Sequence, residues 1–320
     1  MKFRAGAAAG TILLLAACSG SSPSAFVPGA APPESVAASK ASPSNSDARP
    51  ARAAKVLYIA DFDGKPGLGQ IHVYTAGMKN PHQIGVITNG TGRPTGLWVD
   101  DRNYLYAANQ SNLDPASVTE FKPGAASPFF KITNFMGYPM SVAVDAQHNV
   151  YVNESVQDHG FVQVFAPGSN SPLRSIDTGI AGYAFEAGSM AFDPQGNLIV
   201  AEQAKLLLHV VKIAPGSSIA TPMNLNLNNI TGPGLGIDKA GDIYIASSQA
   251  GTASVFAPGQ TQPSRTIAAA GGYGLAWVTP DGAFYEASGE STVIEVAPGA
   301  SSPTATITCT CSAQGVAVSK

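Results

Sequence analysis

The chain has 320 residues, of which 44% are apolar and 12% are charged, and its formal net charge is −3. It contains no run of Lys or Arg, which argues against nucleic acid or an anionic lipid surface as a partner. The 34 Gly and 24 Pro suit an all-β protein rich in turns better than a helical one.

Residues 1–17 predict a cleaved export signal. Met1–Arg4 is basic, and the apolar stretch Ala5–Ala17 is far shorter than the roughly 20 residues of a transmembrane helix. The stretch runs into Leu-Ala-Ala-Cys, which resembles the lipoprotein box of bacteria. This resemblance implies that Cys18 is lipidated and holds the exported protein at the cell envelope. Ser19 follows the cysteine, and by resemblance to enterobacterial sorting it favours the outer membrane in a cell that has one. The alternative is an ordinary secretory peptide with a chance cysteine.

Residues 18–55 predict a disordered tether behind the lipidated cysteine. This segment is mostly Ser, Ala and Pro with few aromatic residues, so it cannot bury enough apolar surface to order itself. We therefore expect the protein to contact the membrane through its lipid anchor alone.

One pattern of four short strands recurs about every 40–50 residues from Val56 to Lys320. In Gly234–Gly259 it consists of a strand ending at Asp238, a turn, a strand containing Tyr244, a polar loop and a third strand before Pro258. The third strands end at Pro-Gly pairs, which begin at Pro123, Pro167, Pro215, Pro258 and Pro298. This period and this number of strands are typical of propeller blades.

The two ends of the repeat region complement each other. The first copy begins at its second strand, Val56–Ile59, and the last copy stops after a first strand, Gly315–Val318. We therefore predict that the C-terminal strand closes the blade that the N-terminal strand opens, which gives an all-β, six-bladed β-propeller over residues 56–320. The alternative, an open β-solenoid, would leave this last strand without partners.

The repeat resembles the NHL group of six-bladed propellers. The resemblance rests on lines such as Gly96–Asp100 in first strands and Tyr58–Asp61 in second strands. It supports the fold, but propellers host many unrelated activities, so it implies no particular reaction.

The residue after each second strand belongs to a ring on the predicted face where the loops between strands 2 and 3 and between strands 4 and 1 open. Ser247 and Ser288 occupy two of the six positions. The other four carry strong hydrogen-bond acceptors, which are Asp61, Asn109, Glu154 and Glu202. Carboxylate and amide oxygens suit a hard cation, so these four are candidates for binding Ca²⁺ or a cationic ligand. The alternative is that each side chain ties down its own turn.

Aromatic and arginine side chains are expected on the same face. They form a candidate contact rim of Arg93, Tyr138, Tyr183, Phe185 and Tyr273. Tyr, Phe and Arg are enriched at contact surfaces, so the rim suggests a protein or glycan partner. The alternative is that these rings wedge between blades.

Catalytic motifs are sparse in the sequence. Lactonase-like six-bladed hydrolases bind a metal through Asn and Asp residues just before their first strands. Neither Asn nor Asp occurs at the equivalent positions here, which are Thr95, Met140, Gly188, Pro233, Tyr273 and Gln314. The five His residues fall at scattered blade phases. A non-catalytic binding or scaffolding role is therefore favoured. A metal-assisted hydrolase or lyase that uses Asp61, Glu154 and Glu202 at the mouth of the central channel is the alternative.

Cys309 and Cys311 are the only cysteines besides Cys18. In an extended strand their Cβ atoms lie too far apart for a disulfide, so a bridge would need a local turn. With no His or further Cys nearby, a metal site has little support. We expect two small residues where the ring closes, and the sequence does not fix the state of their thiols.

Overall fold

The computed structural model describes residues 55–63, 69–110, 115–157, 159–181, 188–204, 207–227, 230, 232, 234–247, 250–272 and 274–320. The predicted signal, Cys18 and the tether as far as residue 54 lie outside these residues, as do Tyr183, Phe185 and Tyr273. In the described part of the chain, no helix has the length and apolar character to cross a membrane.

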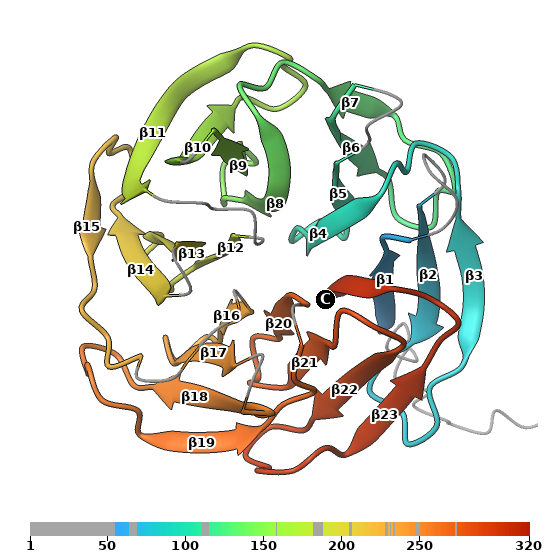
Figure 1. The fold of residues 1–320 in the computed structure, drawn as a ribbon. Coiled ribbons are helices and arrows are strands. Elements are labelled where there is room, and N and C mark those ends of the chain that lie inside the picture. The colour runs from blue at the N-terminus through green and yellow to red at the C-terminus, as the bar shows by residue number, and fades with distance from the viewer. Residues whose placement is uncertain are drawn as a thin grey trace, which may run out of the picture. The chain divides into compact units, whose positions relative to one another are not determined.

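The described residues form six four-stranded antiparallel sheets, which stand as blades around a central axis (Figure 1). Blade 1 consists of β24 (Ala313–Val318), β1 (Val56–Asp61), β2 (Gln70–Thr75) and β3 (Gln83–Ile87). Blade 2 consists of β4 (Pro94–Val99), β5 (Leu105–Asn109), β6 (Ser117–Phe121) and β7 (Phe130–Ile132). Blade 3 consists of β8 (Tyr138–Val144), β9 (Val150–Val156), β10 (His159–Phe165) and β11 (Pro172–Ala181).

The remaining three blades have the same order of strands from the axis outwards (Figure 1). Blade 4 consists of β12 (Ser189–Phe192), β13 (Leu198–Ala204), β14 (Leu207–Ile213) and β15 (Ala220–Pro222). Blade 5 consists of β16 (Leu235–Ile237), β17 (Ile243–Ser247), β18 (Thr252–Phe256) and β19 (Arg265–Ala268). Blade 6 consists of β20 (Ala276–Val278), β21 (Phe284–Ala287), β22 (Thr292–Val296) and β23 (Ala305–Thr308).

The C-terminal strand closes the ring, as the sequence predicted. β24 lies beside β1 with Val318 opposite Leu57 and Val316 opposite Ile59 (Figure 1). Ser319 strengthens this edge, because its side-chain oxygen accepts a hydrogen bond from the Val56 N–H at 2.7 Å. The six-bladed all-β propeller is therefore confirmed, and no open sheet edge separates its first and last blades.

Burial explains why the strands near the axis and those at the rim differ in sequence. All five residues of β5 are buried, as expected for a strand with blades on both of its faces. β11 lies at the rim, and there buried and exposed residues alternate over its second half. Such alternation is typical of a strand with one solvated face.

A repeated aspartate turn links the inner strand of a blade to its second strand. In blade 3 the Asp145 Oδ1 atom accepts hydrogen bonds from the backbone N–H groups of Gln147 (2.9 Å) and Asn149 (2.8 Å). Asp100, Asp193 and Asp238 make the same pair of bonds in their own turns. A short acceptor that bonds the backbone two residues ahead stabilises such a turn.

The inner strands approach one another closely at the end where they begin. A Cβ atom on Gly96 would lie 2.5 Å from the Ser141 Cα in the next blade, so only glycine allows this packing. Beside it the Thr95 hydroxyl donates to the Met140 carbonyl at 2.8 Å. These contacts join β4 to β8.

The sequence left the state of Cys309 and Cys311 open. The two residues form a disulfide, with Cα atoms 5.2 Å apart. The chain bends at residues 310 and 311, between β23 and β24, and this bend supplies the local turn that an extended strand lacks.

Candidate ligand-binding cavity

The four candidate acceptors on the predicted face are buried. Their exposed fractions are 2% for Asp61, 1% for Asn109, 1% for Glu154 and 3% for Glu202. They belong to four different blades and lie in the second strands β1, β5, β9 and β13. Side chains buried to this degree need hydrogen-bond partners inside the protein.

Three of the four acceptors hold the loop that enters their own blade. The side-chain oxygen in the second strand accepts a backbone N–H from the residues just before the inner strand. Glu286, which the sequence analysis did not single out, does the same in blade 6. The pairs are Asp61 with Ser312, Asn109 with Gly92, Glu154 with Gly137 and Glu286 with Ala270. These side-chain oxygens therefore hold the entry loops of their blades in place.

Glu202 instead links two blades. Its Oε1 atom accepts a hydrogen bond from the Asn153 amide in blade 3 at 2.5 Å, and its Oε2 atom accepts one from the Thr178 hydroxyl at 2.8 Å. Burial raises the pKa of Glu202 to about 7, and it raises the pKa of Glu154 to about 7 as well. Both oxygens of Glu202 are thus already engaged by protein donors.

The contact rim is only partly described. The Arg93 guanidinium lies 4.1 Å from the centre of the Phe62 ring, a cation–π contact within the protein. Tyr138 is 54% exposed and stands free for contact with another molecule. The other three members of the rim lie outside the described residues.

A cavity of about 920 Å³ opens at the other end of the channel. All six inner strands line it, together with the aspartate turns that follow several of them and the nearby Tyr151, Leu173 and Arg174. This is the end where inner strands finish, opposite to the end that carries the four candidate acceptors. Its volume is within the range of pockets that hold small organic ligands.

Two tryptophans at one repeat phase shape this cavity. Trp98 pairs with Tyr106 and Trp277 pairs with Tyr285 across their sheets. At the equivalent position the other inner strands carry small residues, which are Ala143, Ala191, Gly236 and Ala317. At this level of the channel, blades 2 and 6 therefore fill the space near the axis with indole rings, whereas the other four blades leave it open.

The aromatic rings around the cavity contact one another. Trp98 packs edge-on against Trp277 with ring centroids 4.9 Å apart, and against Phe192 at 6.3 Å. Tyr151 adds a further edge contact to Phe192 at 5.2 Å. The rings come from blades 2, 6, 4 and 3, so the cavity has an aromatic wall that several blades build together.

Buried polar atoms without partners collect around the cavity. Among the described residues, nine buried side-chain N or O atoms lack a hydrogen-bond partner. Four of these belong to residues that line the cavity, and they are Trp98 Nε1, Ser141 Oγ, Arg174 Nε and Trp277 Nε1. Trp277 is 8% exposed and Ser141 is 4% exposed. These four atoms have almost no accessible surface, and the other five unpaired atoms belong to residues that do not line the cavity.

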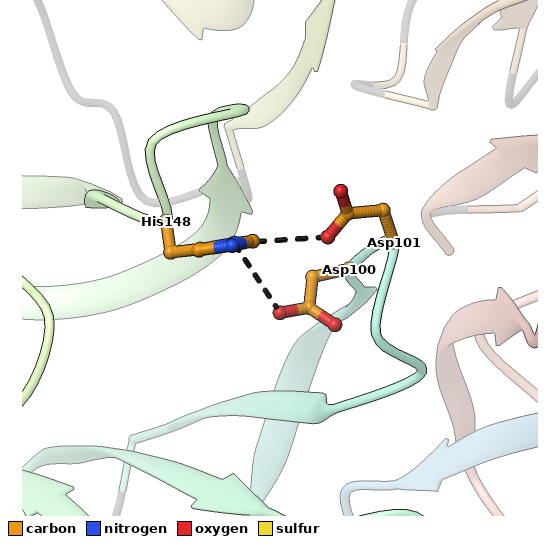
Figure 2. Close-up of side chains that lie close together, drawn as sticks. All are labelled: Asp100, Asp101 and His148. Carbon is orange, nitrogen blue, oxygen red and sulfur yellow. Dashed lines mark ion pairs between the residues drawn. The ribbon is translucent and has the colours of Figure 1, made fainter.

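The rim of the cavity also carries a group with metal-binding atom types. Figure 2 shows Asp100 and Asp101 facing His148, whose Nδ1 atom lies 3.8 Å from Asp100 Oδ2 and 3.7 Å from Asp101 Oδ1. Asp100 Oδ2 already accepts a hydrogen bond from the Arg102 guanidinium at 2.7 Å. Only Asp101 and His148 therefore retain free ligand atoms, fewer than the three or more that metal sites use.

Neither a family model nor a curated protein matches this sequence. Solved structures match its fold. A chain of the nidogen/laminin complex is similar with a TM-score of 0.63 and 17% identity, over 83% of this chain and 98% of that one. A protein of unknown function from Bacteroides caccae is similar with a TM-score of 0.61 and 12% identity, again over 83% and 98%.

The WD40 β-propeller domain of Doa1 is a more distant match. Its TM-score is 0.52 and its identity is 13%, over 80% of this chain and 79% of that one. At these identities the comparisons show a shared propeller fold, and a fold alone assigns no function.

Proposed function

We propose that this chain is an exported, lipid-anchored binding protein with an NHL-like propeller whose ligand occupies the central cavity. The ligand is a small molecule, or the end of a larger glycan or protein partner. In this proposal Cys18 anchors the chain at the cell envelope and residues 19–55 tether the propeller. Binding, without catalysis, is the activity of the propeller itself.

The observation that carries the proposal is the cavity with its aromatic wall and the polar turns at its rim. A concave, mainly apolar site with a few convergent polar groups is the usual form of a small-molecule site. The cavity meets this description through Trp98, Trp277 and Phe192 on its wall and through the aspartate turns at its rim.

Two of the rim carboxylates are engaged in turns, which argues against an acid–base role for them. Asp145 and Asp193 each accept two backbone hydrogen bonds and a third bond from an asparagine amide. Carboxylates held in this way stabilise turns, whereas a catalytic base needs an oxygen free to reach the substrate.

The cavity end of the ring is also a better ligand site than the opposite face, which carries Asp61, Asn109, Glu154 and Glu202. There the oxygens of the second strands are taken up by entry loops and by the link between blades 3 and 4. A ligand or Ca²⁺ would have to displace those donors. The exposed Tyr138 keeps a protein contact at that face possible as a separate event.

The test is a matched pair of substitutions in two equivalent turns. Ala146 is exposed and lines the cavity in blade 3, whereas Ala240 is exposed in the corresponding turn of blade 5 and does not line it. We expect Ala146→Phe to obstruct the mouth and Ala240→Phe to leave it open.

Intrinsic fluorescence provides the readout, because the two tryptophans of the chain are Trp98 and Trp277 and both line the cavity. The purified chain is screened against sugars, amino acids, nucleosides and short peptides. The proposal holds if a compound shifts the emission of the wild type and A240F and fails to shift that of A146F. It fails if no compound shifts the wild type, or if A146F responds as the wild type does.

A further inference from the structure

We propose that the disulfide between Cys309 and Cys311 is a thiol–disulfide exchange site, where a thiol compound attacks the Cys311 sulfur and the pair accepts two electrons. The bond lies in the loop between β23 and β24, at the end of the ring opposite to the cavity. The proposed activity is therefore separate from ligand binding. Three features carry it: the short loop that the bond closes, the backbone that holds both cysteines, and their unequal exposure.

The bond closes a very short loop. Only Thr310 separates the two cysteines, whose Cα atoms are 5.2 Å apart. The entropy that a disulfide removes from the unfolded chain decreases with the length of the loop it closes, so this bond stabilises the folded state little. By linkage, folding stabilises the bond equally little. The fold therefore does not protect this bond against reduction in the way that it protects a bridge between distant strands.

Backbone hydrogen bonds hold the bend on both sides of the cysteines. On the side of blade 6, the Cys309 N–H donates to the Ser291 carbonyl at 2.9 Å. On the side of blade 1, the Ser312 N–H donates to Asp61 Oδ1 at 2.9 Å, and the Ser312 carbonyl accepts from the Phe62 N–H at 3.0 Å. None of these bonds involves a sulfur atom. We therefore expect both thiols to stay adjacent after reduction, so that the bridge can form again without refolding of the chain.

The two cysteines are not equally open to an attacking thiol. Cys309 is 6% exposed and belongs to a core cluster with Val293 and Ile307. Cys311 is partly exposed, and Thr310 beside it is exposed. The rate of exchange depends on access to the sulfur that is attacked. Cys311 is therefore the residue that receives the incoming thiol, and Cys309 provides the leaving sulfur.

The exchange takes two steps. A thiolate R–S⁻ attacks Cys311 Sγ and forms a mixed disulfide, while the bond between the cysteines breaks and the Cys309 sulfur leaves with the electron pair and takes up a proton. A second thiolate attacks the R sulfur, which yields R–S–S–R and releases Cys311 as a thiolate. Two thiols are thereby oxidised to one disulfide, and their two electrons reduce the cysteine pair. A disulfide compound restores the bridge by the reverse steps.

Equilibration with glutathione tests whether the fold protects the bond. The full chain carries Cys18→Ser, so that Cys309 and Cys311 are its only cysteines. It is incubated with mixtures of reduced and oxidised glutathione, in buffer and in guanidinium, and its free thiols are alkylated and counted by mass spectrometry. We expect the equilibrium constants for reduction of the folded and unfolded chain to agree within about tenfold, because the short loop couples them weakly. We also expect reduction to leave the circular dichroism spectrum of the folded chain unchanged.

A matched pair of single variants tests which sulfur is attacked. Cys309→Ser leaves only Cys311, and Cys311→Ser leaves only Cys309. We expect oxidised glutathione to modify the folded Cys309→Ser variant at least about tenfold faster than the folded Cys311→Ser variant. In guanidinium the two rates should become equal, because both thiols are then exposed. A peptide disulfide used in place of oxidised glutathione shows whether the site exchanges with peptide cysteines as well as with small thiols.

Two results would overturn the proposal. A folded chain that resists reduction about a hundredfold or more relative to the unfolded chain would make the bond a structural bridge. Equal rates in the two folded variants, or a faster reaction at Cys309, would show that Cys311 is not the attacked residue. Neither result depends on what occupies the cavity, so the proposed binding function is tested separately.

Discussion

Asn153 donates its side-chain amide to the buried carboxylate of Glu202 and so joins blade 3 to blade 4. The Thr178 hydroxyl completes the site from β11. We predict that Glu202→Ala lowers the free energy of unfolding by about 2–4 kcal/mol, because it removes the buried oxygens that accept from Asn153 and Thr178; Thr178 keeps only its bond to the Gly160 carbonyl, and Asn153 only a longer one. Urea denaturation measures the loss. Glu202→Gln is the matched variant: it keeps an oxygen at the site and should cost clearly less.

Calcium ions give a second arm to this experiment. If the carboxylates serve the fold, millimolar Ca²⁺ leaves the melting temperature of the wild type unchanged and the loss in Glu202→Ala is the same with and without it. Glu154→Ala, which frees the N–H groups of Met136 and Gly137, is expected to behave in the same way. A rise in the wild type with Ca²⁺ that disappears in either variant would restore the cation-binding interpretation.

The stability of the propeller should fall as the pH rises from about 4.5 to about 8. Glu286 is fully buried, and burial raises its pKa from 4.5 to about 8. In this range the folded state keeps the proton that the unfolded chain has lost, so deprotonation favours unfolding until the pH passes the pKa of the folded state. Glu154 and Glu202, whose pKa values are about 7, act in the same direction.

Melting temperatures between pH 4.5 and pH 9 test this dependence. Glu286→Gln is always neutral, so it should flatten the profile and gain on the wild type at pH 8, by an amount on the order of a few kcal/mol. Glu290→Gln removes a carboxylate at an exposed site of the same blade and controls for the change in net charge. A wild-type profile that rises with pH over this range would contradict the prediction.

The repeat made the fold predictable from sequence. Its Pro-Gly pairs and its aspartates recur at fixed phases, because each pair makes a tight turn and each aspartate caps one. The missing first strand at Val56 and the extra strand at Val316 then implied closure, since both would otherwise expose a sheet edge. Such features are local or periodic, and a single sequence displays them.

The site was harder to predict because it depends on packing between blades. The ring of acceptors lies near the ends of the second strands, as predicted. Whether Glu154 faces solvent or its own entry loop depends on the path of that loop, which the sequence pattern does not give. Trp98 and Trp277 share a repeat phase with four small residues, a signal present in the alignment of the repeats. The cavity beside them depends on how all six blades pack around the axis, which a single sequence does not show.

The disulfide between Cys309 and Cys311 should contribute little to stability. It closes a loop of three residues, so the chain-entropy model assigns it only about 1.5 kcal/mol. We predict that the double variant Cys309→Ser/Cys311→Ser folds and melts within a few degrees of the wild type. Melting with and without reductant measures the effect; an inability to fold would show that the bend before β24 depends on the bridge.

Pairing of β24 with β1 should matter far more than the neighbouring disulfide. Ala317 lies opposite Tyr58 and Val316 opposite Ile59, and all four residues are buried. Removing the strand would expose this apolar surface and the backbone donors and acceptors of β1 to water.

We therefore predict that deleting Gly315–Lys320 lowers the free energy of unfolding by several kcal/mol. The shortened chain should then show no cooperative melting transition or fail to express in soluble form. Deleting Lys320 alone is the control, because it removes the chain end and a single exposed hydrogen bond to Asn103 and leaves the strand intact. Thermal unfolding followed by circular dichroism compares the two. Near wild-type melting of the longer deletion would mean that the N-terminal blade is stable as three strands, and the closed ring would then not be what stabilises the propeller.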